Sequence, residues 1–155
     1  MTNARVHVVH DEIVSAPAEA VWPYFDWPNL ERMQEGGFFE AVSYEERRSI
    51  PGATRSIRLG GGNGNGQPLR EQLELADPVA MRLRYRILDP APMPIADYRG
   101  EVNVRALDAV RCCVRFECEC VLNGIDESTW RDLYRNMQRA NIAFIDKSLA
   151  RNARS

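Results

Sequence analysis

The residues best suited to chemistry are an arginine and a glutamate on two successive predicted strands. Arg55 shares the alternation of the apolar residues of its strand, and Glu71 shares that of Leu73, so both side chains should point to the apolar side of the sheet. If the hairpin between them is centred near Asn63, residue 55 lies opposite residue 71, and a bidentate ion pair can form. Such a pair is either a structural contact that fixes the register, or a ligand clamp or general acid/base.

Three polar side chains extend this candidate site. Tyr85 and Tyr98 lie on the apolar side of their strands, where a buried hydroxyl needs a hydrogen-bond partner. Together they could orient a phenol or carbonyl group of a ligand, and the alternative is plain core packing. Asn141 lies near the apolar stripe of a predicted helix, where an unsatisfied amide costs about 1–3 kcal/mol. It therefore requires a protein or ligand partner.

The sequence gives little support for a metal site or for a catalytic triad with a serine or cysteine nucleophile. His7 and His10 are the only histidines, and their odd separation on one strand places them on opposite faces, which disfavours a shared metal site. Neither has a serine or cysteine companion at a triad spacing. The glycine-rich stretch 60–66 lacks the Lys-Ser/Thr of a phosphate-binding loop, so we expect a flexible hairpin loop or a cavity lid. No metal or other cofactor is expected.

The four cysteines fall within one predicted strand, at positions 112, 113, 118 and 120. Next-but-one neighbours on a strand are roughly 7 Å apart, which suits neither a disulfide nor a compact thiolate site without bending. The cysteines are therefore predicted to be reduced and buried.

Composition limits the class of partner. The 155 residues, 45% of them apolar, are predicted to form one domain spanning 1–155. The net charge of -2 gives no positive field for nucleic acid or an anionic membrane, so a small neutral partner fits better. The start of the chain lacks the apolar stretch of a signal peptide, and no segment approaches roughly 18 apolar residues. We expect a cytoplasmic protein without an integral membrane segment.

Seven strands and one long helix are predicted to position these residues. The strands are expected at residues 5–14, 38–45, 53–60, 69–76, 81–88, 95–107 and 110–122, with two short helices after the first strand. Asp126 should cap a helix that runs to about residue 150. Its apolar stripe is predicted to comprise Trp130, Leu133, Tyr134, Met137, Ala140, Phe144, Ile145 and Leu149, while Arg131, Arg135, Gln138 and Arg139 face away.

These elements predict an α+β fold in which a curved antiparallel sheet wraps around the long helix. A seven-stranded sheet has more concave apolar area than one helix stripe can fill, so a cavity should lie between them. The residues expected to line it and contact a ligand are Leu73, Leu83, Phe116, Tyr134, Met137 and Asn141.

The order of elements and several short motifs resemble the helix-grip (SRPBCC) superfamily of START domains, birch-pollen-allergen-like proteins and polyketide cyclase/dehydrase-like proteins. Residues 13–22 (IVSAPAEAVW) resemble its "I-x-x-A-P-x-x-x-V-W" opening. Residues 52–55 (GATR) with 69–71 (LRE) resemble its "G-x-x-R … (apolar)-x-E" hairpin, and 94–98 (PIADY) resemble its "P-x-x-x-Y" strand. The chain departs from this pattern at Phe116, where many members carry tryptophan.

The resemblance implies binding of lipids, aromatics or polyketides, sometimes with cyclisation, dehydration or lyase chemistry. In an enzyme without cofactor, Glu71 would be the acid/base, Arg55 would set its pKa and stabilise an oxyanion, and Tyr85 and Tyr98 would hold substrate oxygens. The alternatives are a non-catalytic carrier or sensor of hydrophobic ligands, in which Arg55 and Glu71 are structural, and an interaction module with a filled core. The sequence leaves a homodimer open.

Overall fold

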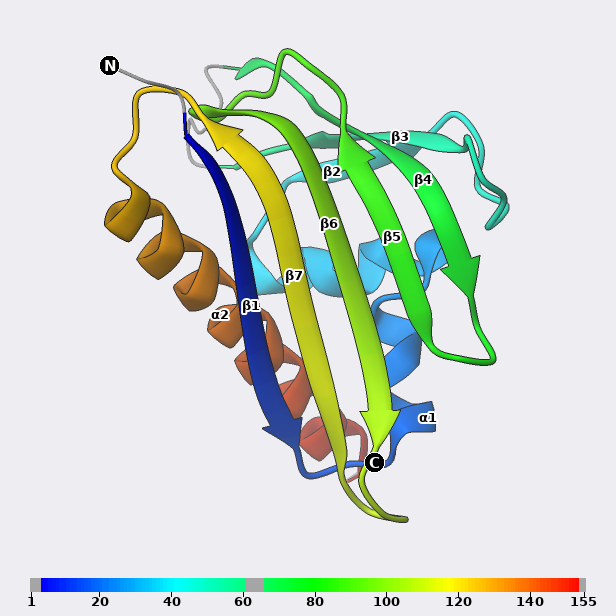
Figure 1. The fold of residues 1–155 in the computed structure, drawn as a ribbon. Coiled ribbons are helices and arrows are strands. Elements are labelled where there is room, and N and C mark those ends of the chain that lie inside the picture. The colour runs from blue at the N-terminus through cyan, green and yellow to red at the C-terminus, as the bar shows by residue number, and fades with distance from the viewer. Residues whose placement is uncertain (1–3, 61–65, 154–155) are drawn as a thin grey trace.

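The computed structural model describes residues 4–60 and 66–153 as one antiparallel sheet with helices on one of its faces (Figure 1). The strand order is β1-β7-β6-β5-β4-β3-β2. The strands are β1 (Arg5–Val14), β2 (Ala41–Tyr44), β3 (Thr54–Arg58), β4 (Leu69–Asp77), β5 (Arg82–Ile87), β6 (Ile95–Ala106) and β7 (Cys112–Leu122). The helices are α1 (Ala18–Val21), the 3₁₀ helices η1 (Trp22–Tyr24) and η2 (Trp27–Gly36), and the long α2 (Glu127–Ala153). The glycine-rich stretch predicted as a loop or lid lies largely outside the described residues.

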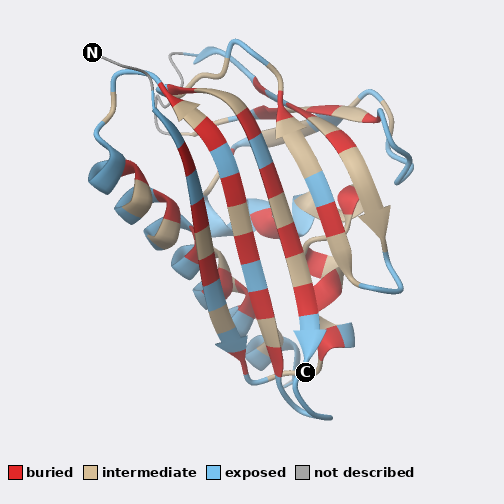
Figure 2. Ribbon diagram, in the orientation of Figure 1, coloured by how far each residue is buried: buried red, intermediate tan, exposed pale blue. Residues whose placement is uncertain are grey.

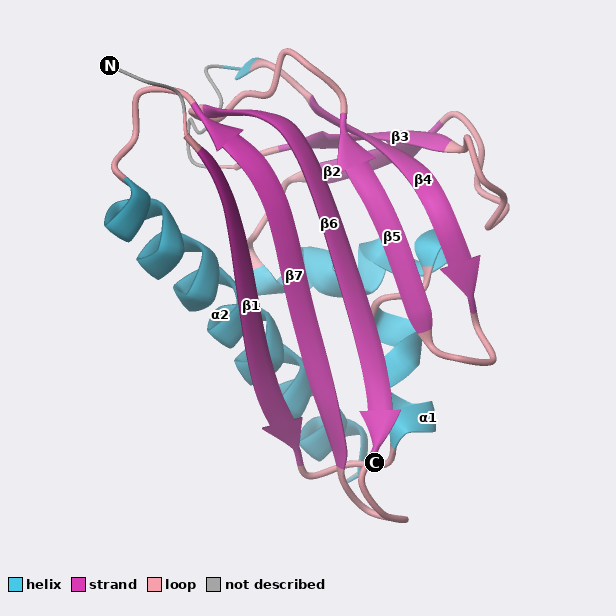
Figure 3. Cartoon of the chain, in the orientation of Figure 1, coloured by secondary structure: helices cyan, strands magenta, loops and turns pink. Residues whose placement is uncertain are grey.

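The alternating strand pattern produces one buried and one polar face of the sheet. On β7, the residues at every second position from Cys112 to Leu122 are buried, while those between them face outward. Figure 2 shows the same alternation as bands of buried and exposed residues along β1, β6 and β7. The helices cover the buried face, and Figure 3 shows them all behind the sheet. No helix in the described ranges is long and apolar enough to cross a membrane.

α2 begins where it was predicted but is rotated about its axis. Asp126 caps it, because its carboxylate accepts a hydrogen bond from the backbone N–H of Thr129 at 3.1 Å. The fully buried positions of the helix are Trp130, Tyr134, Gln138, Ile142, Ile145 and Ser148. The expected outward position of Gln138 is therefore wrong. So is the expected inward position of Leu133 and Met137, which are 50% and 38% exposed on the flank of the helix.

Two β-bulges change which residues face inward. The pairing of β4 with β5 shifts between Leu73 and Leu75, so Leu75, two positions after the inward Leu73, is opposite the outward Arg84. The pairing of β6 with β7 shifts between Ala96 and Arg99, where Asp97 has a φ of 49°. The extra residue allows Tyr98 to point inward.

The two edges of the sheet differ. At β1, the Arg131 side chain of α2 reaches over the edge, and its Nη1 donates a hydrogen bond to the backbone oxygen of His7 at 3.0 Å. At the other edge, β2 has only four residues. α2 is thus attached to the first edge by a side chain, and the second edge is short.

Candidate functional site

Arg55 and Glu71 form the buried pair that the sequence predicted. The register of β3 and β4 places residue 55 opposite residue 71. Nε of Arg55 donates a hydrogen bond to Oε1 of Glu71 at 2.8 Å, and Nη2 lies 2.8 Å from the same oxygen. Arg55 is only 5% exposed and Glu71 7%. The pair therefore uses one carboxylate oxygen rather than the expected two.

Arg55 is fully engaged by the protein. Its Nη1 donates to the backbone oxygen of Trp27 at 2.8 Å, and its guanidinium lies 4.0 Å from the centroid of the Trp27 ring. The Tyr44 hydroxyl donates to the same backbone oxygen at 2.9 Å. Arg55 thus joins the start of η2 to the sheet, and these contacts favour a structural role over contact with a ligand oxyanion.

Glu71 keeps one oxygen for other partners. The two 2.8 Å contacts from Arg55 both fall on Oε1, which leaves Oε2 outside the closest contacts of the pair. The carboxylate lies close enough to Tyr85 that, after burial, its negative charge contributes to raising the pKa of that phenol. Glu71 therefore supplies a negative charge next to the Tyr85 side chain in the interior.

Tyr85 and Tyr98 meet on the buried face, as their alternation predicted. Their hydroxyl oxygens are 3.4 Å apart, and their ring centroids are 6.0 Å apart. The Tyr85 ring lies over Gly100 on the neighbouring strand, where an added Cβ would come within 2.6 Å of Cζ. Burial raises the pKa of Tyr98, and the neighbouring Tyr85 and Tyr134 raise it further. Both phenols are therefore protonated donors at neutral pH.

α2 supplies the other side of the site through Trp130 and Tyr134. The Trp130 ring packs edge-on to Tyr98 with centroids 6.5 Å apart. The centroid of the Tyr134 ring lies 6.2 Å from that of Trp130. Burial raises the pKa of Tyr134, with a further contribution from Tyr85. The indole N–H of Trp130, a residue only 1% exposed, acts as a hydrogen-bond donor toward the Cys118 thiol and has no oxygen or nitrogen acceptor among the described residues. We call Glu71, Tyr85, Tyr98, Trp130 and Tyr134 the tyrosine cluster.

The sequence predicts Trp130 only as part of the apolar stripe of this helix. Its spacing of four residues to Tyr134 places both side chains on one face of the helix, but no sequence pattern marks the indole N–H as a donor to the site.

The remaining predicted ligand residues divide between the interior and the helix flank. Leu73, Leu83 and Phe116 are buried on the same face of the sheet as the cluster. Asn141 is half-buried and donates to Oε1 of Gln138 at 2.9 Å, so its partner is a protein side chain. Met137, in contrast, is on the exposed flank of α2 and does not join this group.

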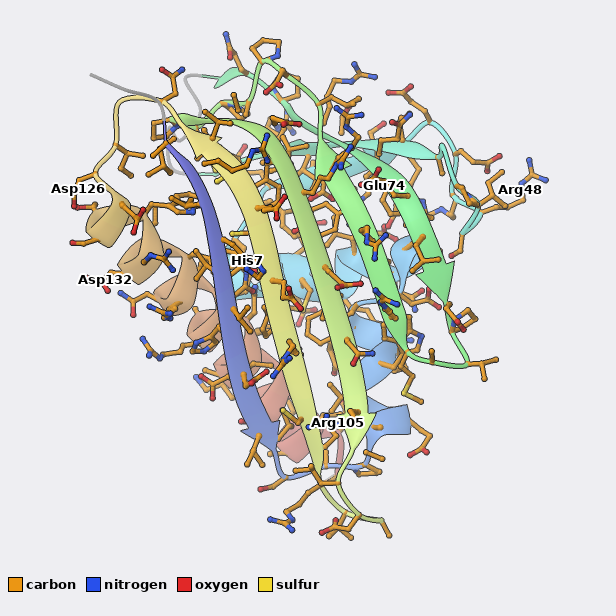
Figure 4. All side chains as sticks on the ribbon, in the orientation of Figure 1. His7, Arg48, Glu74, Arg105, Asp126 and Asp132 are labelled. Carbon is orange, nitrogen blue, oxygen red and sulfur yellow. The ribbon has the colours of Figure 1, made fainter. Side chains whose placement is uncertain are left out.

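The outer face of the sheet is ionic. A hollow of about 230 Å³ around Gly100 is bordered by His7 and Glu74, which Figure 4 labels on the side of the sheet away from the helices. His7 is 2.8 Å from a carboxylate oxygen of Glu117, and Glu74 is 3.7 Å from Arg99. His10 faces the other way and contacts Glu12 at 2.8 Å. The described residues contain no group of three or more His, Cys, Asp or Glu side chains placed to hold a metal ion.

Comparison with known proteins agrees with this architecture. The family model described as "Polyketide cyclase / dehydrase and lipid transport" matches residues 5–154. A search of curated proteins found no significant match.

Solved structures share the fold at low sequence identity. Norcoclaurine synthase from Thalictrum flavum, in complex with dopamine and hydroxybenzaldehyde, superposes with a TM-score of 0.73 at 16% identity, covering 96% of this chain and 88% of that one. A solution structure from Thermobifida fusca gives 0.64 at 27% identity, covering 88% and 85%. The di-domain ARO/CYC BexL from the BE-7585A biosynthetic pathway gives 0.67 at 24% identity, covering 94% of this chain and 46% of that one. The predicted helix-grip fold is confirmed.

Proposed function

The chain belongs to the polyketide cyclase/dehydrase and lipid transport family, and we propose that its interior binds a small hydrophobic molecule with a phenol or carbonyl oxygen. The observation that carries this proposal is the tyrosine cluster. The hydroxyls of Tyr85 and Tyr98 lie 3.4 Å apart, and Tyr85 also interacts electrostatically with Glu71 and Tyr134. A purely structural core would not need this number of polar groups.

The hydrogen-bond donors of the cluster favour binding of a ligand oxygen over binding of a cation. Tyr85 and Tyr98 have raised pKa values, so each offers an O–H donor at neutral pH. The indole N–H of Trp130, whose neighbour is the Cys118 thiol, is a further donor that a ligand oxygen could accept from. A ligand that presents an oxygen acceptor would satisfy these donors, and its rings would pack against Leu73, Leu83 and Phe116.

If the protein is an enzyme, Glu71 is the residue that would move a proton. Its Oε2 is the carboxylate oxygen that could accept a proton from a carbon next to a carbonyl, while a tyrosine hydroxyl donates a hydrogen bond to the developing oxyanion. Arg55 would hold the carboxylate in place without touching the substrate. No metal or cofactor takes part in this scheme.

A carrier without catalysis is the second candidate, and one observation favours it. Each nitrogen of Arg55 already contacts Glu71 or the backbone of Trp27, so the pair performs a structural task whether or not a ligand binds. In a carrier, the tyrosine cluster would orient the ligand, and Glu71 would only hold Arg55.

A binding and turnover experiment separates the two candidates. Native mass spectrometry and thermal-shift titration with naphthols, naphthalene and aromatic polyketides should detect preferential binding of the oxygen-bearing compounds. Tyr98→Phe should weaken that binding, whereas Tyr24→Phe, a buried tyrosine outside the cluster, should not. Turnover that is lost in Glu71→Gln while binding persists identifies an enzyme, and binding without turnover identifies a carrier. Equal binding of naphthalene and naphthol to both variants contradicts the proposal.

A further inference from the structure

The exposed flank of α2 has an unusual order of side chains. The residues Leu133, Met137, Ala140, Phe144, Lys147 and Arg151 repeat every three or four positions and so form one straight line along the helix. The first four are apolar and the last two are basic. Leu133 and Met137 are exposed, although the same helix buries Gln138 and Ser148. The line therefore presents apolar surface that the fold itself does not cover.

A hollow lies along the basic half of this line. Its volume is about 510 Å³, within the range of roughly 300–1,000 Å³ of small-molecule pockets. One wall is α2, with Ala140, Phe144 and Lys147, and the other is the end of η2 with Phe38. The rings of Phe38 and Phe144 meet edge-on with centroids 6.2 Å apart, and both line the hollow. Figure 1 shows η2 running toward α2 behind the sheet.

The glycine at the end of η2 keeps this wall open. A Cβ added to Gly36 would lie 2.4 Å from Cε2 of Phe38 and 3.2 Å from Cδ1 of Phe144. A larger residue would displace the Phe38 ring and crowd the Phe144 ring. The close approach of η2 to α2 is therefore specific to glycine at this position.

The hollow has a positive end. Lys147 is the only lysine in the chain, and its ammonium has no hydrogen-bond or ion-pair partner among the described residues. Arg151 faces Glu35 across the hollow at 3.7 Å. The Lys147 ammonium therefore places a positive charge at the end of an apolar line, which matches a carboxylate or phosphate group.

We propose that this groove binds a free amphiphile with an anionic head and an unbranched apolar chain. The head lies at Lys147, and the chain follows Phe144, Ala140 and Met137 toward Leu133. From residue 147 to residue 133 the helix rises about 21 Å, which is long enough for an extended acyl chain. None of the lining residues belongs to the tyrosine cluster, so this site does not depend on the function proposed for the interior.

The test uses dodecanoate and dodecyl phosphate as probes, with dodecanol and dodecyltrimethylammonium as controls, all below their micelle concentrations. Calorimetric titration of the full chain should detect binding of both anions and weak or no binding of the controls. Lys147→Met should weaken anion binding about tenfold, and Lys147→Arg should restore most of it. Ala140→Trp should abolish binding by filling the groove. Arg139→Met, an exposed residue on the opposite flank, is the matched control and should leave it unchanged.

Several results would overturn the proposal. Equal affinity for dodecanoate and dodecanol, or no effect of Lys147→Met in a folded protein, removes the role of the anionic head. Binding that survives Ala140→Trp but fails in Tyr98→Phe places the probe in the interior. A dimer in solution that dissociates in Met137→Glu assigns the line to a second copy of the chain. Binding to anionic vesicles without binding of the monomeric probes assigns it to a membrane surface.

Discussion

The contact between Arg55 and Glu71 is the residue pair on which most of the site's geometry depends. Arg55 bridges β3, β4 and the start of η2 through Glu71 and the backbone oxygen of Trp27. A charge buried to this extent is tolerated only because every part of the guanidinium has a partner. The pair fixes the strand register and, with it, the direction in which Oε2 of Glu71 points.

The losses of stability from removing the two members of this pair should not add. Arg55→Met leaves Glu71 buried without its counter-ion and should reduce the free energy of unfolding by about 3–5 kcal/mol. Glu71→Leu should act similarly, and the double variant should lose clearly less than the sum of the two. Urea denaturation of the four proteins measures these differences.

The exposed pair of Arg48 and Glu46 is the control for that cycle. Because solvent screens it, Arg48→Met should have a much smaller effect than Arg55→Met. Additive losses for Arg55→Met and Glu71→Leu would show that the two buried side chains act independently.

At the scale of the elements, β5 and β6 have complementary side-chain sizes at one pair of opposite positions. Gly100 lies directly opposite Tyr85, and the tyrosine ring occupies the space that any Cβ at position 100 would need. The absence of a side chain on β6 therefore lets the Tyr85 ring lie close to the sheet, where its hydroxyl reaches Tyr98.

Gly100→Ala should accordingly destabilise the protein, even though alanine is normally preferred over glycine in a strand. Overpacking against Tyr85 should cost about 1–3 kcal/mol in thermal or chemical denaturation. In a Tyr85→Leu background, the same substitution should cost much less. Gly60→Ala, whose added Cβ would meet only the flexible Glu40 side chain at 3.3 Å, should have little effect. A loss at position 100 that is unchanged by Tyr85→Leu would contradict this explanation.

The elements also show what the sequence could and could not predict. Alternation and turn residues located all seven strands, and the symmetry of the hairpin brought residue 55 opposite residue 71, as observed. The bulges were not predicted, because one extra residue shifts the alternation without a marked change in composition. Tyr98 was assigned inward, but the structure achieves this through the bulge at Asp97.

The rotation of α2 has a different cause. Gln138 and Met137 are about 100° apart around the helix, and both continue an i, i+3, i+4 series from Trp130 and Tyr134. Hydrophobicity favours the series through Met137. The structure uses the one through Gln138, because the surfaces of β1 and η2 against which the helix packs decide its orientation. Such a choice depends on tertiary contacts that no local pattern contains.

For the molecule as a whole, the buried Cys112 thiol and the buried phenols should make the folded state less stable as the pH rises into the alkaline range. Burial raises the pKa of Cys112 from 9.0 to about 11, helped by Cys113, Asp146 and Glu19. Between these pH values the unfolded chain releases the thiol proton while the folded chain keeps it, so unfolding becomes more favourable as pH rises. The raised pKa values of Tyr98 and Tyr134 continue the effect above about pH 10.

The free energy of unfolding should therefore fall as pH increases from about 9 to 11. Cys112→Ala should make this fall shallower, because its thiol no longer ionises on unfolding. Urea denaturation at fixed ionic strength measures both slopes, and the difference between the two proteins should be constant from about pH 6 to 8, where the thiol is protonated in both states. Parallel curves through the alkaline range would exclude Cys112 as a source of the pH dependence.

The unequal edges of the sheet have a consequence for aggregation. A strand with free N–H and C=O groups is a template on which another chain can add, and repeated addition produces fibrils. Here the Arg131 side chain occupies a backbone oxygen of β1, and β2 offers only four residues for pairing. If the interior admits a hydrophobic guest, as we propose, the fold exposes apolar surface each time it opens. Obstructed edges allow that opening without giving neighbouring molecules a place to polymerise.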